Sequence, residues 1–399
     1  MRKLRIALTG ATGLLGRNML FEIIKNHQHN LENLEIFVLG RNSTEHQLRD
    51  RIYEILMTDG LDYLAVNTED MEDFLNRLHT VVHIVNIDLT VEKLNLHPDD
   101  FQKLNTAPID YFFHVASLTD FRSTPAVMDS LTRVNVYGTQ QILDLVSSLN
   151  VREFVYISSA YCCGYKAGLI SPDYTNLNGE FRNFYEKTKA EAEILVRDIS
   201  KKGLKYRIFR PSIICGRLQE EQLGSVNKFD VFYGWAAWFL RQKLKKLGNW
   251  NDIYQTKVNL DMRLCYSLNS INIVPADFAA KFIYEVCMKQ LPGYSFHVVN
   301  TDETPNNVIF PFILSSLNIE GVERVDRVPT NPKNKLERFY YKTVGHIFTP
   351  YMTAETMLFH NSGECNKLDI TCPKVDADSL SILMSYAAKQ NFGLMSQQA

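Results

Sequence analysis

Residues 9–16 of this chain read Thr-Gly-Ala-Thr-Gly-Leu-Leu-Gly and directly follow an apolar run at residues 4–8. A strand that ends in such a glycine turn and leads into a helix is typical of a pyrophosphate site. Gly10 permits the tight turn, Gly13 lets the backbone approach the phosphates, and Gly16 lets the helix pack close to the sheet. The phosphates then meet the free N–H groups at the positive end of the helix dipole. The turn predicts a bound dinucleotide and favours redox chemistry; the competing interpretation is a glycine turn without a ligand.

Short apolar strands alternate with amphipathic helices over roughly the first 210 residues. We expect strands at residues 5–8, 35–39, 81–86, 111–114, 154–157 and 206–209. We expect helices at residues 14–26, 45–57, 127–148 and 185–200. This alternation predicts an α/β fold, a Rossmann-type doubly wound parallel sheet with helices on both faces.

The pattern changes after Arg210 and Pro211. Residues 216–226 are typical of a loop and residues 229–247 of a helix, and a strand at 294–299 with a helix at 307–317 indicates a return to the sheet. From about residue 328 the chain is rich in aromatic residues. We therefore expect a cofactor domain at residues 1–215, its sheet completed by residues 270–300. Residues 216–270 and 301–399 are expected to form a smaller, mainly helical substrate-binding region with a C-terminal helical tail.

Composition excludes several classes of function. The formal net charge is −2, so no overall field attracts nucleic acid or an anionic membrane. No apolar run approaches the roughly 20 residues of a membrane span, and the apolar run at residues 4–8 is a short strand, not a signal-peptide core. The seven cysteines include no C-x-x-C spacing, which favours reduced thiols in the cytoplasm and predicts no metal site.

Tyr185 and Lys189 lie one turn apart in a predicted helix and therefore share a face of it. A free phenol has a pKa of about 10 and is a poor proton donor at neutral pH. A neighbouring ammonium group favours the phenolate, so we expect Lys189 to lower the pKa of Tyr185. The pair is a candidate general acid for a carbonyl under reduction, and the competing interpretation is an ordinary exposed helical pair.

Two hydroxyl residues, Ser158 and Ser159, follow the predicted strand at residues 154–157. Side chains at the carboxyl end of a parallel strand face the ligand crevice. Ser159 is therefore expected to donate a hydrogen bond to a substrate carbonyl beside Tyr185. One of the two serines is expected to serve instead as a helix cap or turn residue.

The glycine turn, Ser159, Tyr185 and Lys189 together resemble the extended short-chain dehydrogenase/reductases. Further segments follow in order: Ile-Asp-Leu-Thr at 87–90, Phe-Phe-His-Val-Ala-Ser at 112–117, Arg-Val-Asn-Val-Tyr-Gly-Thr at 133–139, Phe-Arg-Pro-Ser at 209–212 and Val-Pro-Ala-Asp at 274–277. This series is similar to the thioester-reductase branch, which includes fatty acyl-CoA reductases, male sterility proteins and terminal reductase domains of carboxylic acid reductases and peptide synthetases. The resemblance extends over about residues 4–300.

The resemblance implies a role for each matching residue. Tyr185 is the general acid, Lys189 binds the nicotinamide ribose and tunes Tyr185, and Ser159 orients the carbonyl. The cofactor is expected to contact Tyr185 and Lys189 together with Thr9, Gly10, Thr12, Gly13, Leu14, Leu15, Gly16, Arg17, Arg41, Asp88, Leu89, Val115, Ala116, Asn135, Pro211, Ser212 and Ile213. The chain departs from the branch before Asp88, where a glycine is usual, and at Val115, where asparagine is commoner. Both departures lie at the cofactor edge and leave the three catalytic candidates intact.

The second predicted strand ends without an acidic residue. NAD-preferring sites usually carry Asp or Glu there to bind the ribose 2′-hydroxyl. Here Gly40 is followed by Arg41, and Arg17 comes just after the glycine turn. Arginine donates in a fork that suits a phosphate, so the two residues predict NADPH as the cofactor. The alternative is that both arginines are solvated surface residues.

The strongly apolar segment 231–240 is followed by Arg-Gln-Lys-Leu-Lys-Lys at residues 241–246. An apolar slot with a basic rim suits an acyl chain on a phosphate-bearing handle, such as coenzyme A or the arm of an acyl or peptidyl carrier protein. An equally weighted interpretation is a helix with one buried face and cations that favour its C-terminal dipole. Membrane contact through this helix and the aromatic tail is a weaker alternative, since the basic run is short.

The sequence therefore predicts an NADPH-dependent reductase that converts an acyl thioester into an aldehyde and, with a second hydride, into an alcohol. An alternative within the superfamily is an epimerase, dehydratase or ketone reductase that acts on a nucleotide-sugar or a small carbonyl compound. An alternative of another class is a non-catalytic NADP-binding regulator, which the intact Ser159, Tyr185 and Lys189 disfavour.

Overall fold

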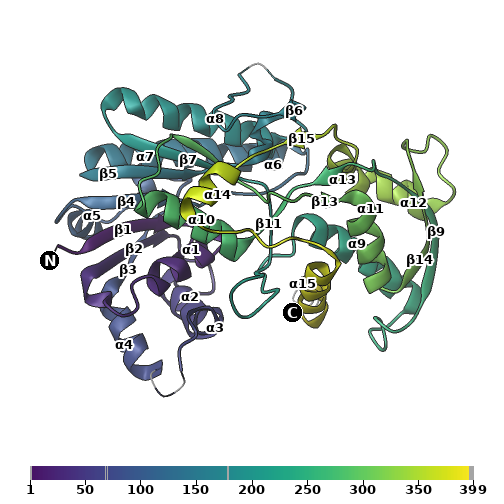
Figure 1. Ribbon diagram of the computed structural model, residues 1–399, viewed down its shortest axis with the longest axis horizontal. Helices are drawn as coiled ribbons and strands as arrows, with labels where there is room; N and C mark the ends of the chain where they lie inside the picture. Colours follow the sequence, from purple (N-terminus) through teal and green to yellow (C-terminus); the bar gives the residue numbers. More distant parts are fainter. Residues whose placement is uncertain (1, 68, 70, 178, 395–399) are drawn as a thin grey trace.

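Seven parallel strands form the central sheet, in the order β3-β2-β1-β4-β5-β7-β12 (Figure 1). The computed structural model describes residues 2–394 except 68, 70 and 178. The sheet strands are β1 (Leu4–Thr9), β2 (Leu34–Gly40), β3 (Val82–Asn86), β4 (Ile109–His114), β5 (Val151–Ile157), β7 (Lys205–Pro211) and β12 (Ser295–Val298). All seven coincide with predicted strands, and the predicted α/β class is confirmed. The strand order reverses between β1 and β4, which is where such sheets bind ligands.

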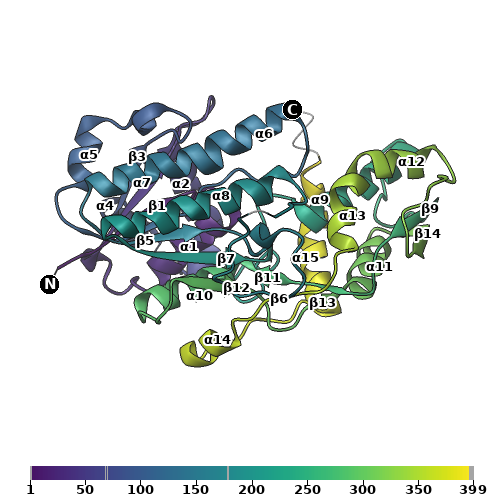
Figure 2. The same ribbon diagram turned by 90° about the horizontal axis from the view of Figure 1, so that it is seen from above.

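The sheet is buried on both faces. Ile6 and Leu8 of β1 share a core with helices α1 (Leu14–Lys25) and α10 (Ala276–Met288), whereas Ala7 between them joins a second core. That second core contains α7 (Gly138–Ser148) and α8 (Phe184–Asp198). Figure 2 shows α7 and α8 over one face of the sheet and α10 over the other. Burial on both faces explains why the strands appear in the sequence as continuous apolar runs.

The helices around the sheet differ in part from the prediction. The expected helix at 127–148 is divided into α6 (Pro125–Leu131), a π-helical segment at Thr132–Tyr137, and α7. The expected helix at 45–57 begins three residues later as α2 (Leu48–Ile55) and continues through a π-helical segment, Leu56–Gly60. The sequence analysis did not anticipate α10. The other helices on this side are α3 (Leu61–Leu64), α4 (Met71–Val81), α5 (Pro98–Leu104) and α14 (Ser362–Leu368).

A further apolar core lies beyond the carboxyl edge of the sheet (Figure 1). It is formed by α9 (Val231–Leu247), α11 (Asn306–Ser316), α12 (Lys335–Lys342), α13 (Val344–Met352), α15 (Ala377–Lys389) and the parallel pair β9 (Val258–Cys265) and β14 (Ile319–Val325). The aromatic residues of the tail supply part of this core. Tyr340 is fully buried, and its hydroxyl accepts a hydrogen bond from the Trp235 indole N–H at 3.0 Å.

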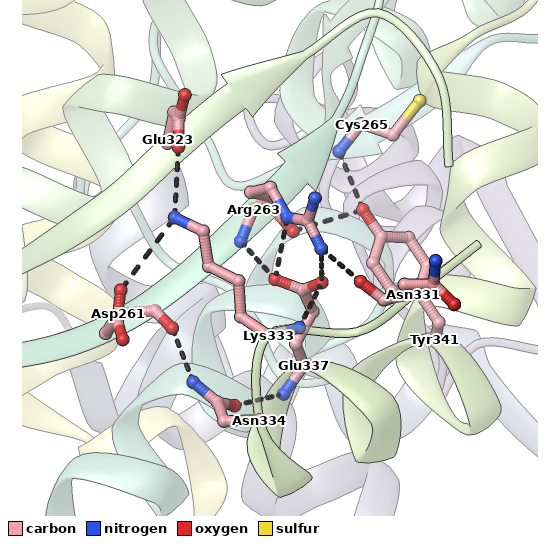
Figure 3. A network of polar contacts seen from close by, with 9 residues as sticks. All are labelled: Asp261, Arg263, Cys265, Glu323, Asn331, Lys333, Asn334, Glu337 and Tyr341. Carbon is pink, nitrogen blue, oxygen red and sulfur yellow. Dashed lines mark hydrogen bonds and ion pairs between the residues drawn. The ribbon is translucent and has the colours of Figure 1, made fainter. Parts of the chain in front are cut away.

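A polar network attaches α12 to β9 (Figure 3). The buried carboxylate of Glu337 accepts hydrogen bonds from the backbone N–H and the guanidinium of Arg263, both at 2.8 Å. Asn334 caps α12 by accepting from the Glu337 N–H at 2.9 Å. The Tyr341 hydroxyl donates to the Arg263 carbonyl at 3.1 Å and accepts from the Cys265 N–H at 3.0 Å. These bonds fix the position of α12, and α13 follows it directly.

Short strands complete the fold. They are β6 (Gly168–Leu169), β8 (Ile213–Cys215), β10 (Ser270–Ile271), β11 (Ile273–Pro275), β13 (Thr304–Pro305) and β15 (Met357–Leu358). The pair β8 and β11 continues from β7 toward α10, and β6 pairs with β15 of the tail. All seven cysteines are buried free thiols. Within the described ranges, no helix has both the length and the apolar character needed to cross a bilayer.

Candidate active site

A cavity of about 600 Å³ lies at the carboxyl ends of the sheet strands, between the glycine turn and helices α9, α11 and α13. The predicted catalytic residues Ser159, Tyr185 and Lys189 line it. All of the predicted cofactor residues also line it, except Arg17 and Asn135. The tertiary structure therefore brings together residues that are up to about 200 positions apart in the chain.

The glycine turn forms a close-packed cradle at one end of this cavity. Gly10 has φ of +78°, and a Cβ there would lie 2.6 Å from the Ala116 nitrogen. A Cβ at Gly16 would lie 2.0 Å from the Gly10 carbonyl oxygen. The Thr9 hydroxyl accepts hydrogen bonds from the N–H groups of Val115 and Ala116, both at 3.1 Å, and so ties β1 to the end of β4. Only glycine fits this cradle, and it presents the start of α1 to the cavity, as a pyrophosphate site requires.

Arg17 does not line the cavity, which corrects its expected place beside Arg41. Its guanidinium pairs with Asp59 at 3.2 Å and donates to the Thr12 carbonyl at 3.2 Å. Burial lowers the pKa of Arg17 to about 10. A mostly buried guanidinium requires a carboxylate partner, and Asp59 supplies one on the outer side of the turn. Arg17 therefore supports the glycine turn from behind.

Asn135 lies in the π-helical segment behind the cavity wall, instead of lining the cavity as expected. Its amide oxygen accepts from the Leu118 N–H at 2.8 Å, and its amide nitrogen donates to the Leu118 carbonyl at 3.0 Å. The same nitrogen donates to the Thr188 hydroxyl at 3.2 Å. Asn135 thus connects the segment after β4 to helix α8, which carries Tyr185.

Two arginines stand at the end of the cavity next to β2. Arg41 lines the cavity as predicted, and Arg51 of α2 lines it as well. The Arg51 guanidinium hydrogen-bonds to the Arg41 carbonyl, which links α2 to the strand end. Asp88, after β3, accepts from the N–H and the hydroxyl of Thr90 at 2.8 and 2.7 Å. Burial acts against it, but these hydrogen bonds and the charge of Arg41 hold the pKa of Asp88 below its usual value.

Ser159 has two contacts at the end of β5. It caps the short 3₁₀ helix Ala160–Cys163 by accepting a hydrogen bond from the Tyr161 N–H at 3.2 Å. Its hydroxyl and that of Thr119, in the segment after β4, also lie close enough to the Tyr185 phenol to favour its ionised form, which opposes the effect of burial on its pKa. The capping role expected for one of the two serines therefore belongs to Ser159, which retains its contact with Tyr185. Thr119 is an additional neighbour of the Tyr185 hydroxyl.

The pKa of Tyr185 is raised to about 12, chiefly because the phenol is buried. The sequence analysis expected the opposite shift, caused by Lys189. The structure shows why that cause is weak here: Lys189 directs its ammonium to the Ile157 carbonyl at 2.6 Å and over the Tyr156 ring. Burial lowers the pKa of Lys189 to about 7, so its charge is itself reduced at neutral pH. Tyr185 is therefore protonated at neutral pH and can donate a hydrogen bond, although the raised pKa makes it a weaker acid than a free phenol.

We expect Lys189→Met to stabilise the protein at pH 7. Lys189 is only 2 % exposed, and its pKa is about 7 in the folded state against about 10.4 in the unfolded chain. Between these values the unfolded chain binds more protons, so the stability of the wild type rises with pH. The Tm advantage of the variant should be largest at or below pH 7 and shrink toward pH 10, which thermal melts across that range measure. A Tm difference between the variant and the wild type that does not change with pH would show that the pKa of Lys189 is not lowered in the folded protein.

The far end of the cavity is apolar. Its walls come from Phe232 and Trp235 of α9, Phe310 of α11, and Phe348 and Met352 of α13. These side chains belong to, or pack against, the core beyond the carboxyl edge of the sheet, and Leu14 at the start of α1 packs against the same core. The chamber offers apolar surface and few hydrogen-bonding groups, which suits an acyl group better than a sugar.

The basic run at residues 241–246 does not form the rim of this cavity. Lys243 is buried and donates to the Leu317 carbonyl at 2.5 Å, and Lys246 donates to the Asn259 carbonyl at 2.6 Å. Lys245 lies over the Phe339 ring. The cations in the last turns of α9 therefore pack against neighbouring elements and donate to carbonyls after α11 and in β9. At the cavity itself, the charged pair Lys228 and Asp230 precedes α9.

Three cavity residues escaped the sequence analysis for different reasons. Thr119 follows β4 at the same sheet edge as Ser159, so its position after a predicted strand was a usable signal. Arg51 faces the cavity from the predicted helix after β2, and its charge next to Arg41 was a weaker signal. Tyr351 reaches the cavity from α13 in the C-terminal tail, and no local pattern marks it.

Comparison with known proteins shows a family to which the sequence is similar. Residues 8–283 match the model of the male sterility proteins, an NAD-binding family. Fatty acyl-CoA reductase 1 of Mus musculus is 26% identical over 251 residues, which cover 56% of this chain and 46% of the mouse protein. L-2-aminoadipate reductase of Schizosaccharomyces pombe is 25% identical over 293 residues, which cover 70% of this chain and 18% of that protein. The chain thus spans about half or less of the length of these curated relatives.

Solved structures share the fold. The terminal R domain from the myxalamid PKS-NRPS biosynthetic pathway has a TM-score of 0.71 at 20% identity, with 98% of this chain and 92% of that chain covered. UDP-glucuronic acid 4-epimerase from Bacillus cereus, in complex with UDP-glucuronic acid and NAD, has a TM-score of 0.60 at 14% identity, with 97% and 99% covered. At these identities the likeness establishes the fold alone, a Rossmann-like parallel sheet flanked by helices.

Proposed function

We propose that this chain, which belongs to the family of male sterility proteins within the extended short-chain dehydrogenase/reductases, reduces acyl thioesters with NADPH. One observation carries the proposal. A single cavity joins the glycine cradle to Ser159 and Tyr185 and then continues into an apolar chamber. A nicotinamide held at one end and an acyl group held at the other would meet beside the Tyr185 hydroxyl.

The residues of the cradle fit a dinucleotide. Gly10 and Gly16 leave space where any Cβ would collide with backbone, and α1 begins at the cavity with no side-chain cap on its first N–H groups. Arg41 and Arg51 provide positive charge where an adenosine 2′-phosphate would lie, and the end of β2 carries no acidic residue. Bound NADPH supplies a hydride. Lys189 would hold its ribose hydroxyls, in keeping with the family pattern.

The chemistry of the protein is the handling of charge on a carbonyl oxygen. Ser159 and Tyr185 both line the cavity, and the Ser159 hydroxyl lies close enough to the phenol to influence its pKa. Both would donate to the thioester oxygen as negative charge develops on it. The Tyr185 Oη proton, retained by a pKa of about 12, would pass to that oxygen when an aldehyde is reduced further to an alcohol. Thr119 would hold the phenol in the orientation that this transfer needs.

The apolar chamber favours a thioester over the nucleotide-sugars of epimerases. Phe232, Trp235 and Phe310 would contact an acyl chain, and the handle, coenzyme A or a carrier-protein arm, would leave past Lys228. We further propose the division of the chain given by the sequence. Residues 1–215, with the sheet completed by residues 270–300, bind the cofactor. Residues 216–270 and 301–399 form the substrate side, and α14 within the latter returns to pack on the core of the sheet.

The test is an NADPH-oxidation screen of the purified chain against acyl-CoAs of several lengths, acyl-carrier thioesters, free aldehydes and a nucleotide-sugar panel. Mass spectrometry identifies each product. We expect turnover with at least one thioester, with free thiol and aldehyde or alcohol as products. Turnover confined to small ketones or nucleotide-sugars would replace the proposal with the alternative reductase or epimerase function. Oxidation with none of the panel would favour a non-catalytic NADP-binding role.

Cofactor preference gives a separate prediction. Arg41→Ala should raise the KM for NADPH about tenfold or more, because a charge-assisted hydrogen bond to a phosphate contributes about 1.5–3 kcal/mol. The KM for NADH should not change, since NADH lacks the 2′-phosphate. Arg49→Ala is the matched control, because Arg49 is exposed on α2 and packs over Tyr53 outside the cavity. Equal turnover of the wild type with NADH and NADPH would refute the preference.

A further inference from the structure

Tyr351 of α13 reaches from the C-terminal tail to the first turn of the helix that carries Tyr185. Its hydroxyl donates a hydrogen bond to the Glu186 carboxylate at 2.7 Å. The same hydroxyl accepts one from the side-chain amide of Asn183 at 2.6 Å. Asn183 is the N-cap of α8 and accepts from the Glu186 N–H at 3.0 Å. One phenol therefore holds both residues that define the start of α8.

The acceptor of this hydroxyl is deeply buried. Glu186 is fully buried, and its carboxylate also accepts from the Arg182 N–H at 3.0 Å and pairs with the Arg182 guanidinium at 3.5 Å. Arg182 in turn lies over the Tyr351 ring. Burial raises the pKa of Glu186, and the bonds from Arg182 and Tyr351 oppose that shift. A buried carboxylate needs its hydrogen-bond donors to stay charged. If Tyr351 moves, Glu186 and the first turn of α8 must move with it to keep the bond.

Tyr351 is itself held on the substrate side. The carbonyl of the next residue, Met352, accepts from the Ser267 N–H at 2.9 Å and from the Asn306 amide at 3.2 Å. These bonds attach the end of α13 to the loop after β9 and to the start of α11. Phe348 and Met352, one turn before and one residue after Tyr351, line the apolar chamber. Tyr351 is thus the place where the chamber wall meets the catalytic helix.

The ring of Tyr351 also belongs to an aromatic group around Tyr185. Phe121 packs edge-on against Tyr185 with ring centroids 5.5 Å apart, and against Tyr351 at 6.1 Å. Tyr161, two residues after Ser159, packs edge-on against Tyr351 with ring centroids 5.5 Å apart. Tyr351 lines the cavity together with these rings. Its contacts therefore reach Tyr185 by two routes, through the start of α8 and through Phe121.

We propose that Tyr351 is a positioning residue for Tyr185: its hydroxyl fixes the first turn of α8 and so aligns the proton donor with the substrate-side wall. The proposal rests on the proposed reductase function for its kinetic consequence, but its structural consequence does not depend on that function. Tyr185 lies in the turn that Asn183 and Glu186 define, so a shift of that turn moves the phenol directly. A misplacement of about 1 Å at a reacting group can reduce a rate by roughly 10²-fold.

Tyr351→Phe removes only the hydroxyl and leaves the ring contacts in place. Tyr341→Phe is the matched control: that hydroxyl also makes two hydrogen bonds, lies on the neighbouring helix, and faces β9 instead of the cavity (Figure 3). Asn183→Ser breaks the contact from the other side, because serine keeps the capping oxygen and loses the amide donor. The wild type and these variants are compared as full chains.

Amide hydrogen exchange gives the readout that does not depend on activity. We expect faster exchange in peptides covering residues 182–190 for Tyr351→Phe and Asn183→Ser, and unchanged exchange there for Tyr341→Phe. Wild-type exchange in that segment of the Tyr351→Phe variant would overturn the proposal, whether or not the chain reduces thioesters.

Kinetics give the second readout. We expect Tyr351→Phe to lower kcat about tenfold with the NADPH Kd unchanged, and Tyr341→Phe to leave kcat unchanged. The double variant Tyr351→Phe/Asn183→Ser should lose less than the product of the single losses, since both act on one turn. An equal loss of kcat in Tyr341→Phe, or fully multiplicative losses, would overturn the positioning role. A wild type that turns over no thioester would refute the proposed function and leave the exchange result to decide the role of Tyr351.

Discussion

Tyr185→Phe is expected to reduce kcat for NADPH-dependent thioester and aldehyde reduction by roughly 10²–10⁴-fold, the range that general acid catalysis supplies. The phenol hydroxyl lies near Ser159 and Thr119 in the cavity, and the ring without it keeps its packing against Phe121. NADPH affinity should stay within a few-fold of the wild type, because the glycine cradle and Arg41 lie elsewhere in the cavity. Steady-state rates and cofactor titration by fluorescence measure the two effects.

The control for this variant is Tyr294→Phe. Tyr294 is 63% exposed, stacks on Tyr206, and lies at the amino ends of the strands, whereas the cavity lies at their carboxyl ends. It should retain full activity. Substantial activity of the Tyr185→Phe variant would show that Tyr185 is not the proton donor. A loss of NADPH binding as large as the loss of rate would show that the residue acts on the cofactor instead.

Gly16→Ala is expected to weaken cofactor binding by more than about tenfold and to lower Tm. The added Cβ would lie 2.0 Å from the Gly10 carbonyl oxygen and 2.6 Å from its carbon, and both are backbone atoms of the turn itself. The turn must open to relieve this contact, at a cost of about 1–3 kcal/mol for an overpacked site. The same opening displaces the N–H groups offered to the pyrophosphate, so affinity should fall by more than about tenfold. Calorimetric titration with NADPH and a thermal melt check both effects.

Gly13→Ala tests cofactor binding independently of the stability of the fold. A Cβ there would meet nothing closer than the Gly10 carbonyl oxygen at 3.4 Å, an ordinary contact. We therefore expect a wild-type Tm and a reduced NADPH affinity, because the methyl group would stand where the backbone approaches the phosphates. Gly363→Ala, in α14 with open space around it, should change neither. An unchanged NADPH affinity of the Gly13→Ala variant would show that the phosphates do not bind against this part of the turn.

The central sheet could be predicted because each of its strands carries its own signal. A strand buried on both faces needs a continuous apolar run, as at residues 5–8 and 154–157, and that run is visible without any partner. Helix α10 carried a helical apolar pattern too, but it follows β11 directly, and only its first residues stood out as a motif. The pair β9 and β14 was missed because its two strands are distant in the chain and stabilise each other only after the substrate side folds.

The direction in which polar side chains point was less predictable. Arg17 and Arg41 look alike in the sequence as cations near a phosphate site. In the structure Arg17 forms an ion pair with Asp59 and does not line the cavity, whereas Arg41 does. The pKa of Tyr185 illustrates the same limit. Spacing placed Lys189 on the same helix face, but the Ile157 carbonyl holds the ammonium and burial dominates both groups. Such outcomes depend on which partner lies within about 3 Å, and that is a property of the packed chain.

By itself the sequence determined the sheet and the glycine turn, through local periodicity and backbone requirements. It also singled out candidates: Tyr185 and Lys189 by their spacing in one helix, and Ser159 by its position after a strand. Only the tertiary structure decided what surrounds them. It brought α13 of the tail against the start of α8, so that Tyr351 contacts Asn183 and Glu186. It also turned the cations of α9 away from the cavity. Contacts across more than 100 residues depend on how separate cores dock, and no local pattern encodes that arrangement.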